Sequence, residues 1–139
     1  QMIAAHQPEL LLVHFPETDA IGHAEGWGAP KYLAKLEETD RYLGRLLKAL
    51  EGAQLRTKTV IILTADHGGA GTKHGGPDAR SQYIPWIMAG PGVRQGYDLT
   101  LQPQRLACVE DTAATALWLL GVPLPAVFLG QPVQEAFTP

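Results

Sequence analysis

Two aspartates and three histidines stand at spacings that could bind metal ions. Asp19 and His23 are four residues apart in TDAIGH, so either a loop or one helical turn lets both side chains face one point. Asp66 and His67 are adjacent in TADHGG, and His74 follows in KHGG. Carboxylate oxygens and imidazole nitrogens suit zinc well, and manganese or iron less distinctively. Because this ligand count exceeds what one tetrahedral ion needs, the sequence predicts two divalent metal ions, with zinc favoured.

The elements that must hold these side chains begin with two apolar runs. Residues 10–15 (LLLVHF) end at Pro16 and are typical of a strand buried on both faces. Residues 59–64 (TVIILT) are rich in β-branched side chains and predict a second buried strand, shortly before Asp66. Open parallel sheets bind ligands beyond the carboxyl ends of their strands. We therefore expect the candidate ligands at one rim of a parallel sheet.

The segment between these two runs predicts an amphipathic helix. From residue 30 to residue 50 leucines recur at spacings of three and four, and Gly52 is placed to end the helix. We expect the leucine stripe of this helix to belong to the core. A strand, a helix and a second strand in this order form a right-handed parallel unit. The predicted fold class is therefore α/β, a mostly parallel sheet flanked by helices.

The second half of the chain continues the pattern of loops, strands and helices. Five glycines in the nine residues 68–76 predict a loop laid over the strand ends. Residues 84–89 (IPWIMA) predict a third strand, and the proline in it favours an edge or an early position. We expect Asp111 or Thr112 to cap a helix that Gly121 closes. The tail after it is rich in proline and glycine and is expected to follow the surface.

Composition limits the classes of partner. A chain of 139 residues with 45% apolar content predicts one compact unit. The net charge is −3 and the 11 Lys and Arg form no basic stripe, so no nucleic-acid polymer is expected as partner. No apolar run reaches the ~18 residues of a membrane-spanning helix, so no membrane segment is predicted in this chain. The lone Cys108 can form neither an intramolecular disulfide nor a cysteine metal cage, and we expect it to pack.

Five segments follow one another in a specific order. They are LLLVHFPETDAIGH, TVIILTADHGG, KHGG, IPWIMAGPGV and DTAATALWLLGVPLP. In order, spacing and expected strand context they resemble the latter half of the alkaline phosphatase superfamily, in its type I phosphodiesterase and nucleotide pyrophosphatase branch. The resemblance runs from about residue 10 to residue 132. It implies an alkaline phosphatase-like fold that is incomplete here, with residues 1–139 forming the carboxyl-terminal metal-binding portion of a larger catalytic domain.

The resemblance also implies a role for each candidate ligand. Asp19, His23 and His74 would hold one zinc ion. Asp66 and His67 would hold the other, together with an aspartate and a nucleophilic threonine or serine from the earlier half. The implied activity is metal-dependent hydrolysis of a small phosphorylated substrate through a covalent phospho-enzyme. We therefore expect the isolated chain to bind one zinc ion measurably, to bind the second poorly, and to turn over almost no phosphodiester.

Several alternatives remain open at this point. Sulfatases, phosphomonoesterases, phosphonate hydrolases and phosphoglycerate mutases of the same superfamily have related metal loops, and a non-catalytic metal-binding fragment is a further reading. As substrate-binding residues we single out Lys73, which could neutralise a phosphate, and Trp27, which could line a pocket. We expect the sheet to lack strands on one side, and an exposed sheet edge could then lead two copies to associate.

Overall fold

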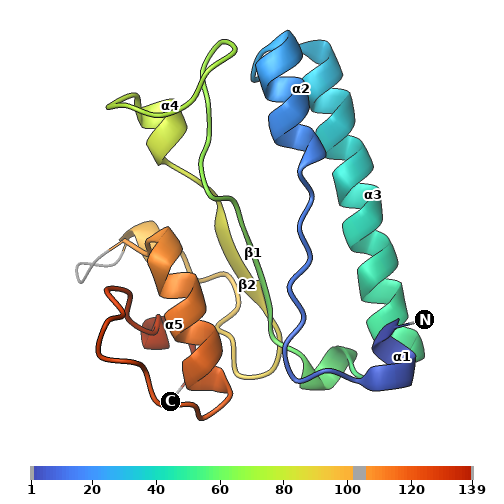
Figure 1. Cartoon of the computed structure of the whole chain (residues 1–139). Coiled ribbons are helices and arrows are strands. Elements are labelled where there is room, and N and C mark those ends of the chain that lie inside the picture. The colour runs from blue at the N-terminus through green and yellow to red at the C-terminus, as the bar shows by residue number, and fades with distance from the viewer. Residues whose placement is uncertain (1, 102–105, 139) are drawn as a thin grey trace. The chain divides into compact units, whose positions relative to one another are not determined.

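Figure 1 shows the computed structural model of the chain, which describes residues 2–101 and 106–138. The prediction of one compact unit is wrong, because the contacts divide the chain into two compact units. The first unit comprises Gln1–Arg56 and Asp66–Ile84, and the second comprises Thr57–Ala65 and Pro85–Pro139. All the candidate metal ligands belong to the first unit.

The first unit is helical. Its helices are α1 (Met2–His6), α2 (Glu17–Glu25), α3 (Pro30–Gly52) and the short α4 (Ala79–Gln82). Helix α3 packs against both α1 and α2, and Figure 1 shows α2 lying alongside the first turns of α3. A proline at its first position favours the start of α3, because the missing N–H would have no partner there. The expected helix is therefore confirmed, and it ends at Gly52 as predicted.

The prediction that the leucine stripe of α3 is core is wrong. No residue of α3 is buried, and Leu33 and Leu36 are 50% and 41% exposed. The cause is that α1 and α2 are too short to cover α3, because α3 has 23 residues whereas α2 and α1 have nine and five. Two short helices leave much of a long apolar stripe open.

The strand expected at residues 10–15 is also wrong. The segment is extended, but the described residues contain no strand that pairs with it. Leu10, Leu11, Leu12 and Val13 are 61%, 41%, 88% and 41% exposed. A run of this composition becomes a buried strand only when neighbouring strands satisfy its backbone and cover both faces.

The second unit contains the sheet. Strand β1 (Ile61–Thr64) pairs with β2 (Trp86–Ala89) in antiparallel fashion, with Ile61 opposite Ala89 and Thr64 opposite Trp86. The mostly parallel sheet is therefore a wrong prediction for the described residues, although both strands lie within their predicted ranges. The β1 residues are half-buried, not buried. Each strand of such a sheet has a free edge, and self-association through one stays a prediction.

Helix α5 (Val109–Leu119) begins earlier than expected. Its N-cap is Cys108, and Asp111 is the third helical residue. The Asp111 carboxylate accepts the backbone N–H of Cys108 at 2.9 Å and that of Gln131 at 2.8 Å, so Asp111 stabilises the helix start from within. Cys108 is exposed, so the expectation that it packs is wrong. Gly121, with φ of 68°, follows the helix end as predicted.

The tail packs against α5. Val133 is 1% exposed, and its N–H donates to the hydroxyl of Thr115, which is fully buried. Three short 3-10 helices complete the described secondary structure: Arg56–Lys58, Leu99–Leu101 and Gln134–Ala136. Within residues 2–101 and 106–138, no helix combines the length and the apolar character needed to cross a membrane.

Candidate metal centre

Helix α2 positions the first two candidate ligands. Asp19 and His23 lie one turn apart on it, with Asp19 Oδ1 3.5 Å from His23 Nε2. Of the two geometries that the spacing allowed, the helical turn is therefore the correct one. Glu17 and Asp19 in the first turn suit the helix dipole, which favours acidic residues at the helix start.

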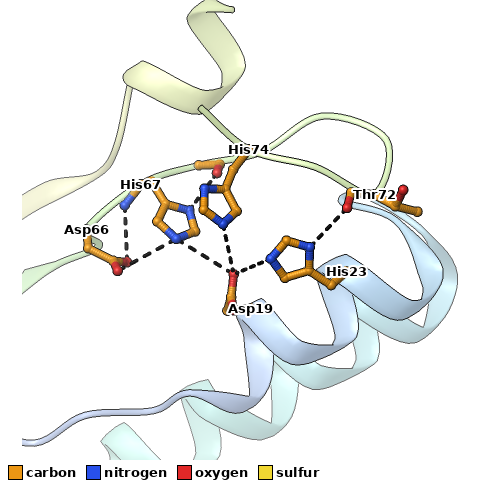
Figure 2. Close-up of polar contacts among 7 residues, drawn as sticks. Asp19, His23, Asp66, His67, Thr72 and His74 are labelled. Carbon is orange, nitrogen blue, oxygen red and sulfur yellow. Dashed lines mark hydrogen bonds and ion pairs between the residues drawn. The ribbon is translucent and has the colours of Figure 1, made fainter. Parts of the chain in front are cut away.

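The glycine-rich loop after β1 brings the third ligand to the same oxygen. Ala70 and Lys73 pair in a tight turn, and Gly71, Gly75 and Gly76 have positive φ angles, which glycine adopts without strain. His74 Nε2 lies 4.0 Å from Asp19 Oδ1. One ligand atom each from Asp19, His23 and His74 all lie within 4.8 Å of one another. Figure 2 shows His67 and His74 of this loop facing the carboxylate of Asp19.

The second candidate pair joins this cluster. His67 Nε2 lies 3.7 Å from Asp19 Oδ1 and 3.7 Å from Asp66 Oδ2. The imidazoles of His67 and His74 are stacked, with centroids 3.6 Å apart and ring planes at 11°. The structure therefore brings all five predicted residues together, and His67 lies between the carboxylates of Asp19 and Asp66 (Figure 2).

Two of the imidazoles are oriented by backbone carbonyls. His23 Nδ1 lies 3.0 Å from the carbonyl oxygen of Thr72, and His67 Nδ1 lies 2.8 Å from that of Gly68. A carbonyl can only accept a hydrogen bond, so each Nδ1 is the donor and carries the proton. In the neutral ring the lone pair is then on Nε2, which is the atom directed at Asp19. Metal-binding histidines are commonly oriented in this way.

Asp19 Oδ1 tests whether this cluster fits a cation. The side chain as a whole is 47% exposed, but Oδ1 itself is buried and accepts no hydrogen bond from the residues that the structure describes. Three Nε2 atoms surround it at 3.5, 3.7 and 4.0 Å, at or beyond the outer limit of a hydrogen bond. A buried carboxylate oxygen that accepts no hydrogen bond is unfavourable. A carboxylate oxygen and imidazole nitrogens are ligand types that fit a divalent cation, and zinc in particular.

Sequence reasoning missed Tyr32 on the first turns of α3. Burial and the negative charge of Asp19 raise the pKa of the Tyr32 phenol above its ordinary value. Its ring also lies 6.2 Å from that of Trp27, centroid to centroid. No local pattern marked Tyr32, because its place near Asp19 follows from how α3 packs against α2. The carbonyl partners of the histidines, at Gly68 and Thr72, likewise leave no signal in side-chain type.

The two expected substrate-binding residues lie differently. Trp27 is half-buried beside the histidines, with its ring 5.1 Å from that of His23. Lys73 is exposed in the turn that precedes His74. Substrate contact by either residue stays a prediction.

Comparison with known families supplies the deciding observation. Residues 1–87 match the family described as type I phosphodiesterase / nucleotide pyrophosphatase. The chain belongs to this family. All five candidate ligands of this type I phosphodiesterase-family chain fall within the matched residues.

Relatives of the chain carry two kinds of name. It is 34% identical over 99 residues to human arylsulfatase K, an alignment that covers 68% of the chain and 18% of that protein. It is 35% identical over 97 residues to zebrafish arylsulfatase K, an alignment that covers 66% of the chain and 18% of that protein. It is 34% identical over 136 residues to a 2,3-bisphosphoglycerate-independent phosphoglycerate mutase of Cereibacter sphaeroides, covering 92% and 24%.

The chain spans less than a quarter of the length of these curated relatives. No solved structure matches the chain significantly. The resemblance expected from the sequence, to the alkaline phosphatase superfamily and its phosphodiesterase branch, is confirmed.

Proposed function

We propose that this chain supplies metal ligands to a phosphate-ester hydrolase that uses two divalent cations, with zinc favoured. The observation that carries the proposal is the buried Oδ1 of Asp19, which faces the Nε2 atoms of three histidines at 3.5–4.0 Å and accepts no hydrogen bond within residues 2–101 and 106–138. Membership of the type I phosphodiesterase family supports the same reading.

Asp19, His23 and His74 form the more complete ligand set. Three protein ligands with a fourth position open are typical of a catalytic zinc site. His67 and Asp66 supply two ligands toward a second cation. When bound, two such cations would polarise the ester oxygens and lower the pKa of the attacking hydroxyl.

The proposal assigns the nucleophile and the missing ligands to another part of a longer protein. Residues 1–139 would then be the carboxyl-terminal metal-binding portion of a larger catalytic domain. The human relative supports a longer protein, since its alignment with the chain covers only 18% of its length. Among the chain's own groups, the carbonyls of Thr72 and Gly68 orient His23 and His67, and each leaves an Nε2 lone pair available.

A zinc titration of the purified chain tests the proposal. We expect calorimetry to show one tight zinc equivalent and a second that is much weaker. We also expect negligible turnover of a nitrophenyl phosphodiester by the chain alone. Absence of any saturable zinc binding would exclude the metal site, and zinc-dependent turnover by the contaminant-free chain would contradict a nucleophile outside it.

Sulfate-ester hydrolysis is the second candidate. Its support is the 34–35% identity to human and zebrafish arylsulfatase K. Both candidates need the same metal ligands, so the chain itself does not separate them. Parallel assays of the longer protein with aryl sulfate, aryl phosphodiester and phosphoglycerate would do so, because they measure directly which substrate is turned over. Preference for aryl sulfate by orders of magnitude would replace the phosphate-ester proposal.

A further inference from the structure

Trp27 occupies a space between two glycines. One is Gly22 on α2 and the other is Gly69 in the glycine-rich loop. A Cβ atom at Gly22 would lie 2.6 Å from Cε2 of the indole, and one at Gly69 would lie 2.3 Å from Cδ2. Real Cβ atoms do not approach other atoms so closely. The indole therefore fits only because both positions lack a side chain.

The same indole lies beside three of the candidate ligands. Its ring centroid is 5.1 Å from that of His23, 5.9 Å from that of His74 and 6.4 Å from that of His67. The ring planes meet at 82°, 71° and 60°, so each contact is edge-on or tilted, as aromatic pairs prefer. One rigid side chain thus contacts imidazoles from both metal-binding segments.

The backbone fastens the two segments at the same place. The N–H of Trp27 donates to the carbonyl of Gly71 at 2.7 Å, and His23 Nδ1 donates to that of Thr72 at 3.0 Å. Gly26 lies so near that a Cβ there would be 3.2 Å from the oxygen of Gly71. The carboxyl end of α2 and the glycine-rich loop are therefore held together around the indole.

We propose that Trp27 is a positioning residue of the metal centre, where it sets the distance at which His23 and His74 face Asp19. The inference rests on the proposed metal-binding function and gives Trp27 a different role from lining a substrate pocket. A large aromatic ring suits it, because the ring has few rotatable bonds and fills the gap between helix and loop. Supporting groups of this kind fix ligand orientation, and their loss typically weakens metal binding roughly 10- to 100-fold.

Trp27→Leu and Trp27→Phe test the role. We measure zinc affinity by competition with a chromophoric chelator, with Trp118→Phe, on α5 in the other unit, as the matched control. We expect Trp27→Leu to weaken binding roughly 10- to 100-fold, Trp27→Phe to weaken it less, and the control to bind as the parent does. Circular dichroism establishes that each variant is folded. A folded Trp27→Leu protein with parental affinity would overturn the proposal.

The glycines provide a second test, in which Trp27 itself is not replaced. Gly22→Ala puts a methyl group where the indole lies, whereas Gly44→Ala adds one where no atom lies within 4 Å. Both glycines are helical. We expect Gly22→Ala, but not Gly44→Ala, to alter the visible spectrum of the cobalt-substituted protein, and Trp27→Leu to relieve the effect of Gly22→Ala. A parental cobalt spectrum in Gly22→Ala would contradict a positioning role.

A metal-free measurement separates this proposal from the proposed function. Proton resonances of the imidazoles of His23 and His74 in the apoprotein report their position relative to the indole. We expect these resonances to move in Trp27→Leu and not in Trp118→Phe. If the parent bound no metal, the proposed function would fail. If instead the parent bound metal but the imidazole resonances did not depend on Trp27, only the positioning role would fail.

Discussion

The Nε2 atom of His23 lies 3.5 Å from the Oδ1 atom of Asp19, one turn earlier on α2. The helix fixes the relative positions of the two residues, so their side chains are held on the same face. The glycine-rich loop adds His67 and His74 around the same oxygen. Asp19 is therefore the residue that all three imidazoles share.

Replacing Asp19 should remove most of the metal affinity. Asp19→Asn keeps the shape but loses the charge, so three imidazoles would face a neutral amide. We expect a loss larger than the roughly 10- to 100-fold that an outer partner contributes, measured by chelator competition. Glu17→Gln, in the same first turn of α2, is the matched control and should bind as the parent does. Equal losses for the two variants would indicate a general effect of charge.

Histidine substitutions should distinguish the two sites. His74→Ala removes a ligand of the more complete set, so we expect the tight zinc equivalent to weaken strongly. His67→Ala should mainly affect the weaker equivalent, because His67 lies between Asp66 and Asp19. Calorimetry measures both stoichiometry and affinity. His6→Ala, at the end of α1, is the control. If His67→Ala abolished the tight equivalent instead, the division of ligands would be reversed.

Local features of the fold were predictable from the sequence. The leucine spacing and Pro30 marked α3, and Gly121 marked the end of α5. The spacing of Asp19 and His23 predicted that both would face one point, and the order of the motifs predicted that His74 would join them. Each of these inferences depends on residues close together in sequence, or on the resemblance to a known family.

The main errors concern packing partners, which local sequence patterns do not identify. Leu12 lies in an apolar run that reads as a buried strand, yet it is 88% exposed because no described strand pairs with it. Leu33 belongs to an apolar stripe that short helices do not cover. The place of Trp27 between two glycines, and of Tyr32 near Asp19, could not be read from spacing either. Both depend on how α2, α3 and the loop pack.

The glycine within α3 should be replaceable with a gain in stability. A Cβ at Gly44 would meet no atom within 4 Å, and alanine loses less backbone freedom on folding than glycine. We expect Gly44→Ala to raise the free energy of unfolding by about 0.5–1 kcal/mol, measured by urea denaturation. Ala34→Gly on the same helix should lower it by a similar amount. A loss in Gly44→Ala would mean that α3 contacts something at this position in solution.

The hydroxyl of Thr115 should contribute measurably to the stability of the second unit. It donates to the carbonyl of Asp111 at 2.7 Å and accepts the N–H of Val133 at 3.0 Å, and it is fully buried. Thr115→Val leaves a buried N–H unsatisfied, so we expect a loss of roughly 1–3 kcal/mol in thermal or chemical unfolding. Thr115→Ser keeps both hydrogen bonds and should lose less. Equal losses would assign the effect to packing.

Asp78 should titrate at unusually low pH. Hydrogen bonds from the side chain and backbone N–H of Arg80 lower the pKa of its carboxyl group to about 2. Folding favours the charged form, so the stabilising contribution is present above the ordinary carboxyl pKa and is lost as pH falls through about 2. Carbon NMR of the carboxyl group measures the titration. We expect Arg80→Gln to raise this pKa, and an unchanged value would contradict the assigned cause.

The hydrogen bond from His23 to the carbonyl of Thr72 joins positions 49 residues apart in the chain. A cation bound by both α2 and the glycine-rich loop would cross-link these two segments. The cross-link would close a long stretch of chain that contains all of α3. Bringing the ends of such a stretch together costs conformational entropy. A ligand that binds only the folded form offsets such costs, and it shifts the folding equilibrium further as the ligand concentration rises. Scarcity of the ion in the surroundings would then reduce the abundance of folded protein as well as its chemistry.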